Sequence, residues 1–273
     1  MYAQAVKSVS VPTQSILFNI DIEGPLTKDK TAVLRVFAKM FYNHCGFYGD
    51  DLKIAKLERF IEKQGKTQQF REAFEKVNGA PWTETRDSFA FFEDDIVSVL
   101  QSTLGMSEQA ARNWFNGEET NELSIAQLVA DIQEYVDGKG KDFRLLFMVD
   151  EVGQYIGDDG DLMINLQSLV EEIGIRCHGK VWVMVTSQEA IDSVVHITGN
   201  DFSKIQGRFN TRLSLSSSSV DEVIKKRVLA KTDAADQLLR MVYDKEHAVL
   251  KNLYTFNNPV LDIKGFTDGA EFS

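Results

Sequence analysis

The sequence predicts an α/β protein built on a parallel sheet. Four apolar runs rich in β-branched residues and bounded by turn signals are expected to be strands, at 15–22, 143–149, 180–185 and 211–215. The second and third runs are almost continuously apolar, which is typical of strands covered on both faces. Helical patterns separate the runs, as the crossover connections of a parallel sheet require.

A long stretch of helical signals separates the first two expected strands. Apolar residues recur at helical spacing in five successive segments, and the last begins at Ser124, whose pairing with Gln127 matches a capping box, and ends at Gly138. This stretch is too long for a single crossover helix. We therefore expect residues 26–137 to form an inserted helical subdomain.

The α/β core is then expected to comprise residues 1–25 and 138–215. Within it, a helix with Asp161 as its cap follows the second strand, and another helix containing Ile191 follows the third. Beyond the fourth strand a short serine run leads into further helical signals. We expect residues 216–273 to form a truncated, lid-like helical segment.

Composition limits the partners and the compartment. The chain has 273 residues with 30 basic and 41 acidic side chains, a net charge of −11. A broad DNA-binding face needs clustered Lys and Arg, so direct nucleic-acid contact is not expected. Cys45 and Cys177 are too few for a disulfide framework, which favours a cytoplasmic protein. No apolar run approaches the ~20 residues that span a bilayer, so no membrane contact is expected.

The second expected strand ends in the acidic pair Asp150–Glu151. An apolar strand that delivers Asp and then Glu at its carboxyl end is the Walker B arrangement of P-loop ATPases. In that arrangement Asp150 holds Mg²⁺ through water and Glu151 polarises the water that attacks the γ-phosphate. The alternative is a solvated acidic turn after a buried strand.

The third expected strand ends in Thr186 and Ser187. If this strand neighbours the second, these hydroxyls lie beside the acidic pair, at the sensor 1 position that contacts the γ-phosphate or the lytic water. The alternative role for Ser187 is to cap the following helix, which stabilises a helix by ~1 kcal/mol. The two roles are compatible.

Two arginines flank the start of the fourth expected strand. Arg208 lies just before it, where oligomeric ATPases place an arginine that reaches the γ-phosphate of a neighbouring subunit. Arg212 begins the strand and is better interpreted as a partner in a local ion pair. The alternative for both is an ordinary surface arginine.

The phosphate-binding loop G-x-x-x-x-G-K-[ST] is not found in the sequence. The run Gly65–Lys66–Thr67 has Phe60 where the first glycine is required. The opening residues fit the end of the helix that follows such a loop. We therefore expect a fragment that begins downstream of its phosphate-binding loop and does not hydrolyse ATP alone.

Three runs carry a family resemblance: LLFMVDEVGQYIGDDGDLMINLQSLVEEIG, GKVWVMVTSQEAID and SKIQGRFNTRLSLSSSSVDEVIKKRVLAK. They closely resemble the large P-loop ATPase of bacteriophage-exclusion (BREX) defence systems, the BrxC/PglY type. The resemblance covers most of the chain from Ser15 onward and is most specific over residues 145–231. It implies an AAA+/ASCE-like sheet that lacks its P-loop strand, with 143–149 lying between 15–22 and 180–185.

The resemblance also implies partners and cofactors. ATP and Mg²⁺ are the expected cofactors of the full-length protein, which is expected to form a homo-oligomer and to act in phage defence with a DNA methyltransferase and a phosphatase-like component. A non-hydrolysing scaffold with the same fold is the alternative. Glu151 favours hydrolysis, because a scaffold needs no carboxylate to activate water.

Overall fold

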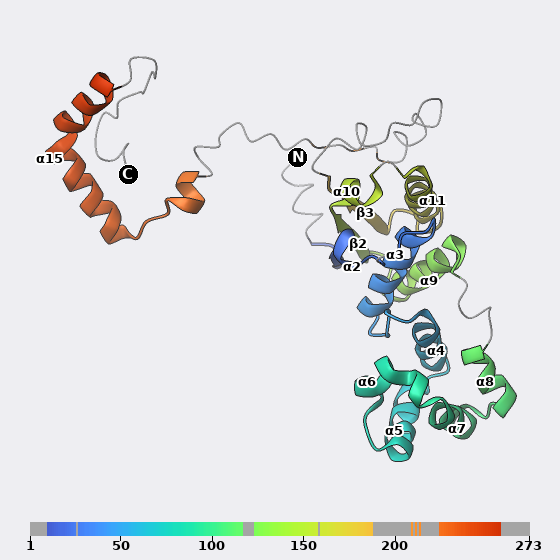
Figure 1. Cartoon of the computed structure of the whole chain (residues 1–273). Coiled ribbons are helices and arrows are strands. Elements are labelled where there is room, and N and C mark those ends of the chain that lie inside the picture. The colour runs from blue at the N-terminus through green and yellow to red at the C-terminus, as the bar shows by residue number, and fades with distance from the viewer. Residues whose placement is uncertain are drawn as a thin grey trace. The chain divides into compact units, whose positions relative to one another are not determined.

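The computed structural model describes residues 10–25, 27–116, 123–157, 159–187, 209, 211, 213 and 224–257. The chain divides into two compact units, 1–210 and 211–273. In the first unit, one group of helices lies beside a small sheet and a second group lies away from it (Figure 1). In the second, the described residues form a short π-helix, η3 (Ile224–Val228), and the long helix α15 (Asp233–Asn257).

The sheet has three parallel strands in the order β1 (Thr13–Asn19), β2 (Arg144–Asp150) and β3 (Val181–Val185). The expected order, with the second strand in the middle, is confirmed. Asn19 lies opposite Asp150 in the register. Since all three strands run the same way, their carboxyl ends meet at one edge. The fourth expected strand, 211–215, falls largely outside the described residues.

The expected strand 15–22 is wrong at its carboxyl end. After Asn19 the chain turns into the short helix α2 (Ile20–Glu23). The side-chain oxygen of Asn19 caps this helix, accepting from the backbone N–H groups of Asp21 at 2.9 Å and Ile22 at 3.2 Å. The β-branched residues after Asn19 favour a strand, but the local cap satisfies the helix N–H groups and ends the strand.

One face of the sheet packs against three helices: α3 (Ala32–His44), α9 (Ile125–Gly138) and α11 (Gly160–Arg176). Phe37 of α3 lies at the centre of this contact, with its ring centroid 5.5 Å from that of Phe18 and 5.3 Å from that of Phe147. These three helices and the strands therefore share one hydrophobic cluster.

The opposite face of the sheet is open among the described residues. Leu17, Trp182 and Met184 are 69%, 59% and 49% exposed. The register places Leu17, Met148 and Met184 in one row across the three strands. The sequence predicted strands covered on both faces. In the part of the chain that the structure describes, only one face of the sheet is covered.

A second hydrophobic cluster lies between α3 and α9 in the sequence, over residues 54–115. We call residues 52–116 the helical subdomain; its elements are α4 (Leu52–Lys63), α5 (Thr67–Asn78), α6 (Trp82–Thr85), η1 (Arg86–Phe91), α7 (Glu93–Leu104) and α8 (Glu108–Asn116). This range is narrower than the segment 26–137, because α3 and α9 pack in the cluster of the sheet.

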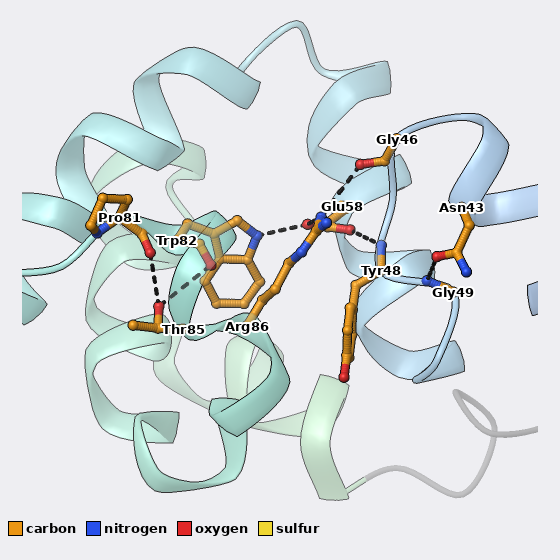
Figure 2. Close-up of polar contacts among 9 residues, drawn as sticks. All are labelled: Asn43, Gly46, Tyr48, Gly49, Glu58, Pro81, Trp82, Thr85 and Arg86. Carbon is orange, nitrogen blue, oxygen red and sulfur yellow. Dashed lines mark hydrogen bonds and ion pairs between the residues drawn. The ribbon is translucent and has the colours of Figure 1, made fainter.

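A buried glutamate organises the helical subdomain (Figure 2). Glu58 of α4 is 7% exposed and accepts from Trp82 Nε1 at 2.7 Å, Arg86 Nη1 at 3.0 Å and the backbone N–H of Tyr48 at 2.5 Å. Three donors offset the cost of burying its charge. The contact also ties α4 to the loop that precedes it. The next residue, Arg59, pairs with buried Asp131 of α9 at 2.9 Å.

Two expected caps have different outcomes. Ser124 accepts from the backbone N–H of Gln127 at 3.1 Å, so its role at the start of α9 is confirmed. The prediction that Asp161 caps α11 is wrong, because Asp159 accepts from the N–H groups of Asp161 and Leu162. The helix begins at Gly160, two residues earlier than a cap at Asp161 would place it.

Candidate functional site

The candidate site lies at the carboxyl edge of the sheet. It contains all four of the predicted site residues that the structure describes, together with one that the sequence did not predict: Asp150, Glu151, Thr186, Ser187 and Asn19. The expectation that the ends of the second and third strands lie side by side is confirmed. Arg208 and Arg212 lie outside the described residues.

Asp150 and Thr186 are joined directly. The Thr186 hydroxyl donates to Asp150 Oδ1, and the backbone N–H of Glu151 contacts both Thr186 Oγ1 and Asp150 Oδ1 at 3.2 Å. Within the described residues, Asp150 Oδ2 makes no hydrogen bond, and Asp150 is exposed. One carboxylate oxygen is therefore held in place, while the other is accessible to water or a ligand.

Glu151 adopts a left-handed backbone conformation, with φ 60° and ψ 28°. For a residue with a side chain this conformation costs on the order of 1 kcal/mol, and such outliers gather at functional sites. Glu151 stands at the turn between β2 and α10 (Val152–Ile156). From this turn its Oε2 accepts a hydrogen bond from Asn19 Nδ2 at 2.6 Å.

Asn19 uses both ends of its side-chain amide. Its oxygen accepts from the first N–H groups of α2, which leaves the NH₂ group to donate to Glu151. The cap therefore fixes which end of the amide meets the carboxylate. One feature of the sequence could have identified Asn19 as a site residue: it is a polar residue inside an apolar run. Its register partner in β2 is Asp150.

Ser187 packs tightly against the first turn of α10. A Cβ atom added to Gly153 would lie 2.0 Å from Ser187 Oγ and 3.0 Å from Ser187 Cβ, so an alanine there would force Ser187 to move. The backbone N–H of Val152 donates to the Thr186 carbonyl at 3.0 Å, which fixes α10 to the end of β3. The Ser187 hydroxyl is buried without a hydrogen-bond partner among the described residues. The helix that it was expected to cap lies outside them.

The donor set limits the kind of metal that the site can hold. The described residues contain no group of three or more His, Cys, Asp or Glu side chains placed to bind a metal ion. Mg²⁺ needs no such group when it binds with a nucleotide, because one or two carboxylates, waters and phosphate oxygens complete its shell. The accessible oxygen of Asp150 fits that mode of binding.

No family model matches the chain, and no solved structure matches it. The structure itself establishes a mixed α/β fold with a three-stranded parallel sheet. The described residues include no helix that is both long enough and apolar enough to cross a membrane. The function is therefore inferred from the residues at the carboxyl edge.

Proposed function

We propose that this chain is part of an ATP-hydrolysing P-loop protein with an AAA+-like core, of the kind that acts in BREX phage defence. The observation that carries the proposal is the arrangement of Asp150, Glu151 and Thr186 at one edge of a parallel sheet, with Glu151 held by Asn19. The resemblance of the surrounding sequence to the BREX ATPase supports the more specific assignment, including its oligomeric state and its methyltransferase and phosphatase-like partners.

Each residue has a distinct role in this proposal. Asp150 would hold Mg²⁺ through water, and the ion would offset the negative charge of the phosphates. Glu151 accepts a proton from the attacking water, for which its carboxylate must be oriented. Thr186 fixes Asp150. The Ser187 hydroxyl is buried against Gly153, so it would have to rotate out of that contact to reach the γ-phosphate or the water. Arg208 would act on the nucleotide of a neighbouring subunit.

The proposal places the phosphate-binding loop outside these 273 residues. Most of the binding energy for the triphosphate comes from that loop, through its backbone N–H groups and its lysine. Calorimetric titration of the 273-residue chain with ATP and Mg²⁺ is therefore expected to show weak binding or none. Micromolar binding would mean that the chain contains a phosphate site of another kind.

The decisive test uses the full-length protein. Glu151→Gln keeps the shape of the side chain but removes the base, so ATP binding is expected to persist while turnover falls by at least ~10²-fold. Glu75→Gln, at an exposed position of α5, is the matched control and is expected to leave turnover unchanged. A parent protein that binds ATP without hydrolysing it would support the scaffold alternative.

A further inference from the structure

The short helix α2 lies between the candidate site and the loop that precedes the helical subdomain. Asn19 caps its first turn and Glu23 is its last residue. Glu23 pairs with Lys39 Nζ of α3 at 2.8 Å, and the same Nζ pairs with Asp50 at 2.8 Å. Asp50 lies two residues before α4, the first helix of the helical subdomain. We call Glu23, Lys39 and Asp50 the clamp.

Lys39 is suited to hold two carboxylates at once. Its side chain is 27% exposed, so its contacts are screened less by water than those of a fully exposed pair. Burial lowers the pKa of Lys39, but hydrogen bonds to Asp50 and Glu23 outweigh that effect and raise the pKa overall. The ammonium group is therefore charged at neutral pH.

The loop that carries Asp50 is fixed on both sides. A Cβ added to Gly49 would lie 2.2 Å from the Lys39 carbonyl oxygen, and the Gly49 N–H donates to Asn43 Oδ1 at 2.8 Å. On the other side, buried Glu58 binds the backbone N–H of Tyr48 (Figure 2). A shift of α4 therefore moves this loop and, with it, Asp50.

The clamp is also accessible. Glu23, Lys39 and Asp50 line a cavity of about 580 Å³, together with apolar side chains that include Val36 and Leu52. Lys28 anchors α2 separately, through Asp21 at 3.6 Å and the Tyr155 carbonyl at 3.0 Å, but it makes no contact with the helical subdomain among the described residues. Among the ion pairs of the described residues, those of the clamp connect α2 to the Asp50 loop.

We propose that Lys39 is a positioning residue for Glu151, and that the clamp transmits movement of the helical subdomain to the hydrolytic site. With the clamp intact, α2 holds the Asn19 amide so that its NH₂ group meets Glu151. When Asp50 moves away, Lys39 loses one of the two carboxylates that hold its ammonium group, so its contact with Glu23 is held less firmly, α2 loosens and the Asn19–Glu151 contact weakens. The catalytic part of this inference rests on the proposed function, whereas the structural link does not.

The link is tested by NMR on the 273-residue chain labelled with ¹⁵N-asparagine. The Asn19 side-chain amide signal is assigned by its loss in Asn19→Ser. In Lys39→Met it is expected to move toward the position of a free amide and to exchange faster with water. Lys39→Arg, which keeps the charge, is expected to restore it. Asp50→Asn breaks only the half of the clamp on the subdomain side and is expected to shift the signal in the same direction.

Lys180→Met is the matched control, because it removes an ion pair with Asp137 at 2.7 Å away from the clamp. An Asn19 signal that is unchanged in both Lys39→Met and Asp50→Asn, or that moves equally in Lys180→Met, would overturn the link. In the full-length protein, Lys39→Met is expected to lower kcat by ~10–10²-fold with little change in KM. If the NMR shift occurs but the parent protein does not hydrolyse ATP, the proposed function fails while the link stands.

Discussion

Asn19 and Glu151 are 132 residues apart in the sequence, yet Nδ2 of the first donates to Oε2 of the second at 2.6 Å. The contact joins the ends of two adjacent strands through side chains alone. It gives the carboxylate a fixed direction at the site. The same asparagine caps α2, so a single residue couples the helix to the carboxylate.

Asn19→Asp is expected to lower stability by ~1–2 kcal/mol at pH 7, because it places a second carboxylate beside Glu151. The new side chain still caps α2, so the loss reports the replacement of the Asn19–Glu151 hydrogen bond by repulsion and not the loss of the cap. At pH 4, where part of the carboxylate population is protonated, the loss is expected to shrink. Urea unfolding at the two pH values measures this difference, and an equal loss at both would contradict it.

Gly153→Ala is expected to destabilise the chain by ~1–3 kcal/mol, because the added methyl group would lie 2.0 Å from Ser187 Oγ and 3.0 Å from Ser187 Cβ, and rotation of the hydroxyl does not relieve the second contact. Gly174→Ala is the control. Gly174 lies in α11 with no atom within 4 Å of an added Cβ, so this change is expected to be stabilising by ~0.5–1 kcal/mol. Thermal unfolding of the two variants should give shifts of opposite sign.

Glu58→Gln is expected to cost ~3 kcal/mol or more, because it leaves the partly buried Arg86 guanidinium without its charge partner. Glu62→Gln, at an exposed position on the same helix, is expected to be nearly neutral. Denaturation followed by tryptophan fluorescence measures the two stabilities, and Trp82, which binds Glu58, is one of the three tryptophans that contribute to the signal. Equal stabilities of the two variants would mean that the buried charge contributes nothing.

Burial raises the pKa of the Cys45 thiol to about 12 and that of Cys177 to about 11, from an ordinary value of 9.0. Between pH 9 and 11 the unfolded chain therefore loses these protons while the folded chain keeps them, so stability falls as the pH rises. A Cys45→Ala/Cys177→Ala variant is expected to show a shallower fall. Both thiols are expected to react slowly with iodoacetamide at pH 8 until urea unfolds the chain.

Arg208→Ala in the full-length protein is expected to preserve ATP binding and to reduce hydrolysis by ~10³-fold, as for arginines that act across a subunit interface. Mixing this variant with Glu151→Gln creates some interfaces that contain both intact residues, so partial activity is expected to return. If mixed oligomers form and activity does not return, Arg208 does not act in trans.

The sheet and most of its site could be predicted from the sequence. Long apolar runs indicate strands, and polar residues at their ends indicate an edge, so the convergence of Asp150, Glu151 and Thr186 follows from parallel pairing. Asn19 was missed because β-branched residues continue past it. The composition predicts that the strand continues to residue 22. The strand ends at Asn19 because its side chain caps α2.

The division between the two hydrophobic clusters could not be predicted from periodicity. A helical stripe shows that a helix buries one face, but not against which partner, so α3 and α9 were grouped with the helices that lie between them. The burial of Glu58 could not be predicted from the sequence either. Its partners Trp82 and Arg86 follow 24 and 28 residues later, and no local pattern links them.

The pairing of β1 with β2, which sets Thr13 opposite Arg144, has a consequence for how the chain folds. Closing so long a loop costs conformational entropy before any strand contact offsets it, and contacts distant in sequence form slowly. The helical subdomain is built from neighbouring segments, so its contacts form at a smaller entropic cost. It is therefore expected to acquire protection from hydrogen exchange first during refolding. The carboxyl edge, with Asn19 and Glu151, is assembled only when β1 finally meets β2.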